Sequence, residues 1–182
     1  MKKNTKVFIS GALVSLAVAA SAFALKENRY FNVSAEQQNL SVTWDASKKT
    51  SSTYATTKTA NGNDVTIYGS NLITTGDEDI MFYLRGNGAG IYFSSTNYAF
   101  QAISSISITY MPGASGGLTL YFGNDLSNMY NGESHSMKLG DSNFSKQTNE
   151  FQPTDPSNAN FFTIWSTSDS AIYSITVNYL CE

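Results

Sequence analysis

The chain has 182 residues, of which 41% are hydrophobic, 13% aromatic and 14% charged, and its formal net charge is −3. Residues 1–24 hold three of the 11 basic residues and none of the 14 acidic ones, so without them the formal charge becomes −6. Nucleic acids and anionic membranes are bound by clustered Lys and Arg, so we expect neither as a partner. The single cysteine, Cys181, excludes an internal disulfide.

The N-terminus has the three-part layout of a secretory signal peptide. Three lysines precede an apolar run over residues 7–20, and small residues follow where a signal peptidase cleaves. The run is shorter than the roughly 20 residues that a membrane-spanning helix needs. We therefore expect a signal peptide over residues 1–24, cleaved after Ala24 or after Ala22. The product is a secreted protein with no transmembrane segment and a single domain over residues 25–182.

Beyond residue 24 the chain shows the period of two that is typical of strands with one buried face. Asn-Gly and Pro-Gly dipeptides, which favour turns, separate the runs. We expect long connections over residues 45–63 and 140–160, the first being either a surface loop or an irregular edge strand. The nine predicted strands are Leu40–Trp44, Val65–Tyr68, Ile80–Leu84, Gly90–Ser94, Ser105–Met111, Leu118–Phe122, His135–Leu139, Phe161–Trp165 and Ala171–Leu180.

Two of these strands nearly repeat one another. Residues 102–111 and 171–180 both follow the pattern A-I-x-S-I-[ST]-[IV]-x-Y-[ML]. Ile, Val and Tyr fall on one face and Ser, Thr or Asn on the other, as in an antiparallel sheet that is covered on one side. The copies either hold equivalent positions in a doubled topology or converge on a common core pattern. Taken together, the strands predict an all-β fold, a two-sheet antiparallel β-sandwich with jelly-roll topology.

No arrangement typical of a catalytic site stands out. His135 is the only histidine and no nucleophile elbow surrounds it, so we interpret it as a surface residue at a strand start. Glycoside hydrolysis stays open, because it needs two carboxylates that face one cleft. We expect a protein that is not an enzyme and requires no cofactor. The candidates for a carboxylate pair are Asp77, Glu78, Asp79, Glu133, Asp141 and Asp169.

An acidic loop precedes one predicted strand. Asp77, Glu78 and Asp79 follow Gly76 directly and supply the hard oxygen ligands that Ca²⁺ prefers. The loop is either a structural calcium site at these three residues or a solvated turn, since it lacks the spacing of an EF-hand.

Several aromatic residues fall on the outward phase of their strands, namely Tyr68, Tyr92, Tyr121 and Trp165. Tyr or Trp on a rigid sheet can stack on the apolar face of a sugar, while polar side chains bind its hydroxyls. Ordinary half-exposed aromatic residues of a sandwich show the same pattern. The predicted ligand-binding residues are Tyr92, Tyr121 and Trp165, together with Arg85 and Asn124, which lie near them in the sequence.

Four segments carry a resemblance to known modules: G-I-Y-F-S-S at 90–95, I-S-S-I-S-I-T-Y at 103–110, L-T-L-Y-F-G at 118–123 and A-I-Y-S-I-T-V at 171–177. In strand rhythm the chain resembles the jelly-roll accessory modules of secreted bacterial proteins, similar in layout to carbohydrate-binding modules and galactose-binding-like domains. The resemblance implies a non-catalytic module that binds an extracellular glycan or cell-surface component through its loop end or an exposed aromatic face. A structural or adhesive protein acting through protein contacts, and a small glycan-active enzyme, are the alternatives.

Overall fold

The computed structural model describes residues 38–86, 88–93, 100–113, 117–125, 130–137 and 145–181. The predicted signal peptide, residues 1–24, lies outside them. Eleven strands and two short 3₁₀ helices, η1 (Ala46–Lys48) and η3 (Pro156–Asn158), make up the regular structure of the described part. No helix in that part is long and apolar enough to cross a membrane.

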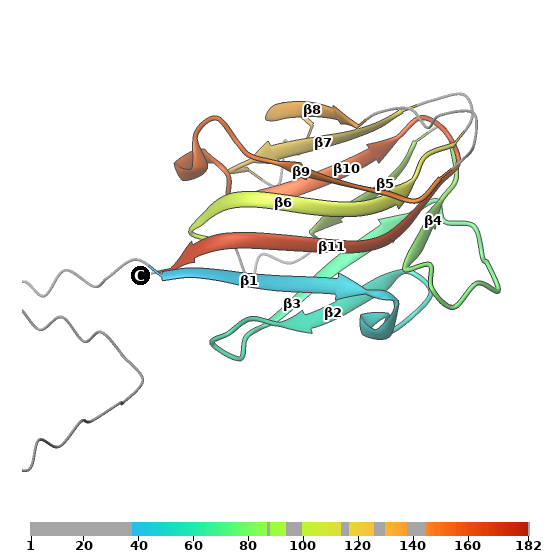
Figure 1. The fold of residues 1–182 in the computed structure, drawn as a ribbon, viewed down its shortest axis with the longest axis horizontal. Helices are drawn as coiled ribbons and strands as arrows, with labels where there is room; N and C mark the ends of the chain where they lie inside the picture. Colours follow the sequence, from blue (N-terminus) through green and yellow to red (C-terminus); the bar gives the residue numbers. More distant parts are fainter. Residues whose placement is uncertain are drawn as a thin grey trace, which may run out of the picture. The chain divides into compact units, whose positions relative to one another are not determined.

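The strands form two sheets in which every pairing is antiparallel (Figure 1). The five-stranded sheet has the order β1 (Gln38–Asp45), β11 (Ser170–Cys181), β6 (Ala102–Met111), β9 (Gln147–Phe151), and β4 (Phe82–Leu84) also pairs with β11. The six-stranded sheet has the order β2 (Tyr54–Lys58), β3 (Asp64–Ser70), β5 (Ala89–Phe93), β10 (Phe161–Ser166), β7 (Leu118–Gly123), β8 (Glu133–Met137). The predicted two-sheet antiparallel β-sandwich is therefore confirmed, while the jelly-roll topology stays a prediction.

Each of the nine predicted strands overlaps an observed one, and two further strands lie where connections were expected. Strand β2 lies at one edge of the six-stranded sheet, within residues 45–63. Strand β9 ends the order of the five-stranded sheet, and the prediction of a connection over residues 140–160 is wrong at this point. Both strands are short, and polar residues dominate them, because each has only one hydrogen-bonded neighbour.

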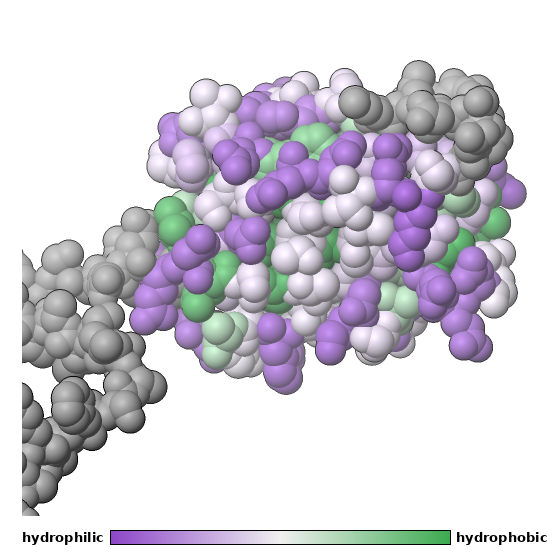
Figure 2. All heavy atoms as spheres, in the orientation of Figure 1, coloured by the Kyte–Doolittle hydropathy of each residue, from purple (hydrophilic) through white to green (hydrophobic). Residues whose placement is uncertain are grey.

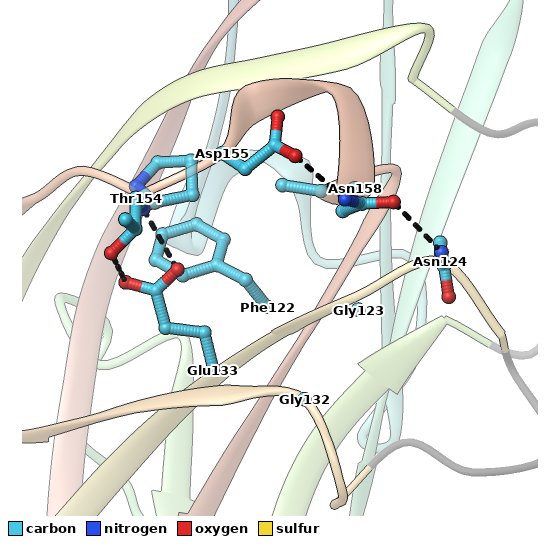
Figure 3. A pocket seen from close by; sticks show the side chains of 10 residues that line it. Phe122, Gly123, Asn124, Gly132, Glu133, Thr154, Asp155 and Asn158 are labelled. Carbon is cyan, nitrogen blue, oxygen red and sulfur yellow. Dashed lines mark hydrogen bonds between the residues drawn. The ribbon is translucent and has the colours of Figure 1, made fainter.

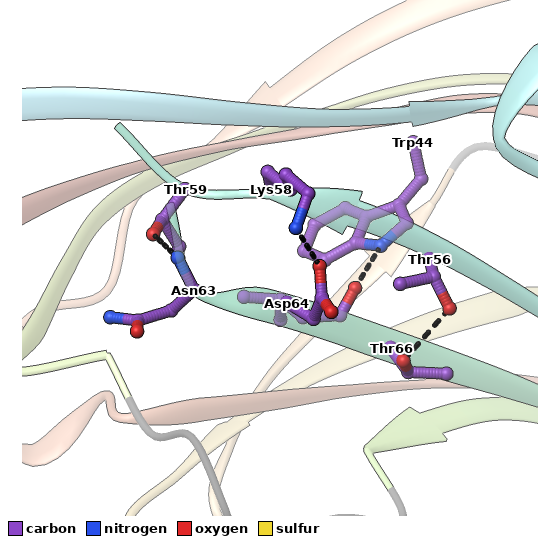
Figure 4. A network of polar contacts seen from close by, with 8 residues as sticks. Trp44, Thr56, Lys58, Thr59, Asn63, Asp64 and Thr66 are labelled. Carbon is purple, nitrogen blue, oxygen red and sulfur yellow. Dashed lines mark hydrogen bonds and ion pairs between the residues drawn. The ribbon is translucent and has the colours of Figure 1, made fainter. Parts of the chain in front are cut away.

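The core lies between the sheets, and Trp44 joins them. Its indole is fully buried on β1 and meets Phe162 of β10 in an edge-to-face contact, with ring centroids 6.2 Å apart. Its Nε1–H donates to the main-chain oxygen of Val65 on β3 over 3.0 Å (Figure 4). The polar end of the side chain is thus satisfied inside the core, as a buried tryptophan requires.

The repeated strands β6 and β11 are direct neighbours, and their repeat explains how they pair. Ser107 pairs with Thr176 at the centre, and one register irregularity lies on each side of that pair. Ser104 and Tyr173, the third residues of the two copies, are the extra residues at these bulges. A bulge places isoleucines three positions apart on the same face, which is why A-I-x-S-I keeps both of its isoleucines in the core. The copies are equivalent about a local twofold axis of the strand pair.

The outer face of the five-stranded sheet is polar (Figure 2). Thr43 and Thr176 share a hydrogen bond between hydroxyls at 2.9 Å, and so do Thr109 and Thr148. These cross-strand hydroxyl pairs satisfy one another, as expected for a solvent-facing scaffold.

Candidate functional site

The outer face of the six-stranded sheet carries a continuous row of register partners, one from each strand. The pairing joins Tyr54 to Tyr68, Tyr68 to Tyr92, Tyr92 to Thr163, Thr163 to Tyr121 and Tyr121 to Ser134. Each of these residues alternates with an inward neighbour, so the strand period sends all six side chains to the same side. We call these six positions the aromatic row; its members in order are Tyr54, Tyr68, Tyr92, Thr163, Tyr121 and Ser134.

Three tyrosines at one end of the row contact one another. The ring centroids of Tyr54 and Tyr68 lie 5.7 Å apart, and those of Tyr68 and Tyr92 lie 6.2 Å apart. The interplanar angles are 35° and 25°, so the rings follow one another in similar orientations across β2, β3 and β5. All three side chains are half-buried. This end of the row forms a band of aromatic surface across three strands.

Trp165 lies one row further along β10, beside two glycines. Atoms of its indole six-membered ring come within 3.3 Å of where a Cβ on Gly88 would stand, and within 3.4 Å for Gly90. Gly88 has a φ of +102°, which other residues rarely adopt. Glycine at these positions leaves the indole room to lie against the strand, and the ring covers backbone that would otherwise face solvent.

Tyr130 joins the ring of Tyr121 in the row to the ring of Trp165 in the next row. It precedes β8, is 43% exposed, and contacts Tyr121 at 5.8 Å and Trp165 at 5.1 Å between ring centroids. Burial raises the pKa of the Tyr130 hydroxyl, and Tyr92 and Tyr121 raise it further. Thr163 is only 2% exposed, although it stands at an outward position between Tyr92 and Tyr121. We call the whole surface the aromatic face; its rings are those of Tyr54, Tyr68, Tyr92, Tyr121, Tyr130 and Trp165.

The structure therefore brings the three predicted aromatic residues onto one surface. Tyr92, Tyr121 and Trp165 all lie on the aromatic face, and the Tyr130 ring contacts those of Tyr121 and Trp165. Sequence analysis missed Tyr130, because a loop residue carries no periodic signal. It also placed Tyr54 in a connection, although the T-Y-A-T-T run around it has the β-branched and aromatic composition of a strand.

The other two predicted ligand-binding residues lie at opposite ends of the sandwich. Asn124 follows the last residue of β7, whose partner is the first residue of β10. Arg85 follows β4, which pairs with the first residues of β11, and its side chain is exposed. Its main-chain N–H donates to the Asn71 oxygen over 3.0 Å. Arg85 and Asn124 are thus near the aromatic residues in the sequence, but neither belongs to the aromatic row.

Asn124 instead lines a separate cavity of about 290 Å³ (Figure 3). Its amide donates to Asn158 Oδ1 over 3.2 Å, and the Asn158 amide donates to Asp155 over 2.7 Å. Across the cavity, Glu133 accepts hydrogen bonds from the main-chain N–H of Thr154 at 2.7 Å and from its hydroxyl at 2.9 Å. Glu133 therefore holds the segment before β10 against the edge of the six-stranded sheet, while Asp155 bonds Ser157 and Asn158 within that segment.

His135 bonds to Glu133 at this edge and is half-buried, so it is not the surface residue that we predicted. We call the hydrogen bonds among Glu133, His135 and Thr154 the edge network. Its Nε2 lies 2.8 Å from Glu133 Oε1, and its half-buried ring contacts Phe122 and Phe151. Burial raises the pKa of Glu133, but hydrogen bonds from Thr154 and His135 outweigh it, so the pKa lies below its ordinary value. Hydrogen bonds from Ser157 lower the pKa of Asp155 as well.

The acidic loop is an exposed turn in the structure. The Asp77 carboxylate accepts the main-chain N–H of Asp79 over 3.0 Å, and the N–H of Asp77 donates to the Thr75 hydroxyl. Asp77, Glu78 and Asp79 are all exposed. The described part of the chain holds no group of three or more His, Cys, Asp or Glu side chains placed to bind a metal ion. Calcium at Asp77, Glu78 and Asp79 stays a prediction.

Comparison with known proteins found similar structures but no match in sequence. No family model matches the chain, and no curated protein matches it in sequence. A family two carbohydrate esterase from Cellvibrio japonicus has a TM-score of 0.42 and 12% identity, over 78% of this chain and 34% of that one. A rhamnosidase from Klebsiella oxytoca with rhamnose bound has a TM-score of 0.35 and 14% identity, over 54% of this chain and 22% of that one.

The C-terminal CBM6 of LamC, a laminarinase from Zobellia galactanivorans, has a TM-score of 0.38 and 11% identity, over 75% of this chain and 98% of that one. The chain spans about a third of the esterase and less than a quarter of the rhamnosidase. With TM-scores below 0.5, these similarities assign neither a family nor a function.

Proposed function

We propose that the protein is a secreted, non-catalytic module that binds a glycan on its aromatic face. The observation that carries the proposal is the convergence of six aromatic rings from five strands and one loop onto one side of the six-stranded sheet. Scattered surface aromatics need no explanation, but neighbouring, partly exposed rings gathered on one face mark an interaction site.

The chemistry of the aromatic face suits a sugar better than an apolar partner. Hydroxyl side chains accompany the rings: Ser134 ends the aromatic row, and Ser70, Thr119 and Ser136 lie in the same cross-strand row as Trp165. Aromatic rings cover the apolar C–H face of a pyranose, and hydroxyls exchange hydrogen bonds with its edges. Serine is depleted at interfaces between proteins, so the serines around these rings favour a sugar over a protein partner.

The cavity at the edge of the six-stranded sheet, lined by Glu133 and Asp155, is poorly suited to hydrolysis. Glycoside hydrolysis needs one carboxyl group that is protonated near neutral pH, and therefore has a raised pKa. Glu133 and Asp155 line the same cavity, but hydrogen bonds lower the pKa of each. Both carboxylates are also engaged in holding the segment around η3. This pair is suited to structure and not to general-acid catalysis.

The test is affinity electrophoresis of the protein without residues 1–24, in gels that contain soluble polysaccharides. We expect retardation by at least one glycan and a loss of retardation in Trp165→Ala. The matched control is Tyr173→Ala, which removes a half-buried aromatic ring from the five-stranded sheet. Truncation of a central aromatic contact costs about 2 kcal/mol or more of binding free energy, which corresponds to a dissociation constant roughly 30-fold larger.

Two results would overturn the proposal. One is retardation that Trp165→Ala and Tyr173→Ala leave equally unchanged, which would place binding elsewhere. The other is an absence of binding across the glycan panel together with concentration-dependent association that Trp165→Ala abolishes. That second result would assign the aromatic face to contacts between protein chains. Release of reducing sugar from the bound glycan would instead show an enzyme.

A further inference from the structure

We infer that the ligand is a neutral polysaccharide, bound as a single chain that crosses the strands of the six-stranded sheet and passes Tyr130. This inference rests on the proposed function and defines its ligand. It is carried by three features of the aromatic face: its charge, the direction of the aromatic row and the orientation of the Tyr130 ring.

The charge of the face points to a neutral ligand. Among the described residues of the six strands, the outward positions hold only two charged side chains, Lys58 and Asp64. These two form an ion pair with 2.7 Å between Lys58 Nζ and Asp64 Oδ1, so they cancel each other (Figure 4). A glycan of uronic acids or sulfated sugars would find no unpaired cation on these outward positions, although such ligands are bound through Arg and Lys.

The direction of the row fixes the path of the chain. The six row positions are register partners, so the row runs perpendicular to the strands from β2 to β8. Neighbouring strands lie about 4.8 Å apart, so five such spacings give a row of about 24 Å. The ring spacings of 5.7 and 6.2 Å along it are close to the length of one sugar unit. An extended chain laid along the row therefore meets Tyr54, Tyr68 and Tyr92 with successive units.

Tyr130 prevents the face from being flat. Its ring makes angles of 86° with Tyr121 and 71° with Trp165, so the three rings share no common plane. Among the described residues, Tyr130 is the one exposed large hydrophobic side chain, with 43% of its surface accessible. A crystalline polysaccharide presents a plane of many parallel chains and needs coplanar rings beneath it. A single chain can bend past an upright ring and pack against its side.

The experiment compares soluble and insoluble probes with the mature protein. Oligosaccharides of increasing length from the glycan that retards the wild type are titrated by calorimetry. Polygalacturonate and alginate serve as charged soluble probes, and microcrystalline cellulose and chitin serve as flat insoluble ones. The variants are Tyr130→Ala, Tyr130→Phe and, as a control at a half-buried tyrosine of the five-stranded sheet, Tyr83→Ala.

We expect affinity for neutral oligosaccharides to rise with length until the chain spans the row, and no binding to the charged or crystalline probes. Tyr130→Ala should weaken binding of the soluble chain by about tenfold, in the range of an interface residue that matters. Tyr130→Phe, which keeps the ring, should bind more tightly than Tyr130→Ala. Tyr83→Ala should bind as the wild type does.

Three outcomes would overturn the inference. Binding of uronic acid polymers through Trp165 would refute the neutral ligand, and retention on crystalline cellulose or chitin would refute the single chain. Affinity that is already complete with a monosaccharide would refute the path along the row. In each case a glycan still binds, so the proposed function survives. If no glycan of any kind binds, the proposed function fails, and this inference fails with it.

Discussion

Replacing Trp44 by phenylalanine removes the hydrogen bond that joins the indole to the facing sheet. The variant keeps an aromatic ring beside Phe162 but removes the Nε1–H that donates to the Val65 oxygen over 3.0 Å. A buried acceptor that loses its donor costs about 1–3 kcal/mol. The smaller ring also leaves a void where the fully buried indole was. Trp44→Ala, which removes the whole ring, should cost about 3–5 kcal/mol.

Urea denaturation followed by circular dichroism measures both losses. We expect the midpoint to fall for Trp44→Phe and further for Trp44→Ala, with an unchanged dependence of free energy on urea concentration. Thr43→Ala, on the outward side of the same strand, is the control and should change stability little. A loss below about 0.5 kcal/mol for Trp44→Phe, the size of ordinary surface substitutions, would show that the sheets are not joined at this residue.

Two further predictions concern the edge network and can be checked by thermal unfolding. The pKa of Glu133 is lowered in the folded state from its ordinary value of 4.5, so the stability it contributes is present above that pH and is lost as the pH falls through the lowered pKa. Glu133→Gln should therefore flatten the decline of Tm below pH 4.5, and an unchanged decline would contradict the assignment. A Cβ on Gly132 would collide with the Phe122 carbonyl oxygen, whereas one on Gly123 would meet no atom within 4 Å. Gly132→Ala should cost about 1–3 kcal/mol and Gly123→Ala little, and equal Tm values would refute this packing.

Much of the fold could be predicted because alternation survives in the sequence of every well-paired strand. The inward and outward residues of β6, β7 and β11 follow directly from a period of two. The bulges were less visible, since the third residue of each repeat reads as an ordinary strand position until Ser104 and Tyr173 are seen without register partners. Strand β2 agrees with the edge strand that was one of the two alternatives for residues 45–63, whereas β9 was missed because edge strands have one neighbour and tolerate polar sequences.

For the site, the sequence could predict which residues of a single strand point outward, but not which strands lie side by side. The outward phase of Tyr92, Tyr121 and Trp165 is local information, but their convergence depends on the order β5-β10-β7, which no single strand encodes. Tyr130 reaches them from a loop. Asn124 directly follows β7 but lines another cavity, which shows that distance along the chain is a poor guide to a shared site.

The hydrogen bonds around the cavity lined by Glu133 and Asp155 also join residues far apart in the sequence, which a local pattern does not predict. Glu133 and Thr154 are separated by 21 residues and meet because β8 and the segment before η3 close the same edge. No motif spans that separation in the sequence. His135 likewise has a hydrogen-bond partner in Glu133 two residues earlier, but its packing against Phe151 comes from the other sheet.

The aromatic face can be tested directly by tryptophan fluorescence. The chain has two tryptophans, so in Trp44→Phe the only emitting indole is Trp165. Titration of this variant with a soluble neutral glycan that retards the wild type should shift the Trp165 emission, with saturation at the concentration that gives half-maximal retardation. Retardation of the same variant with no change in Trp165 emission would place the ligand away from the aromatic face and contradict the account.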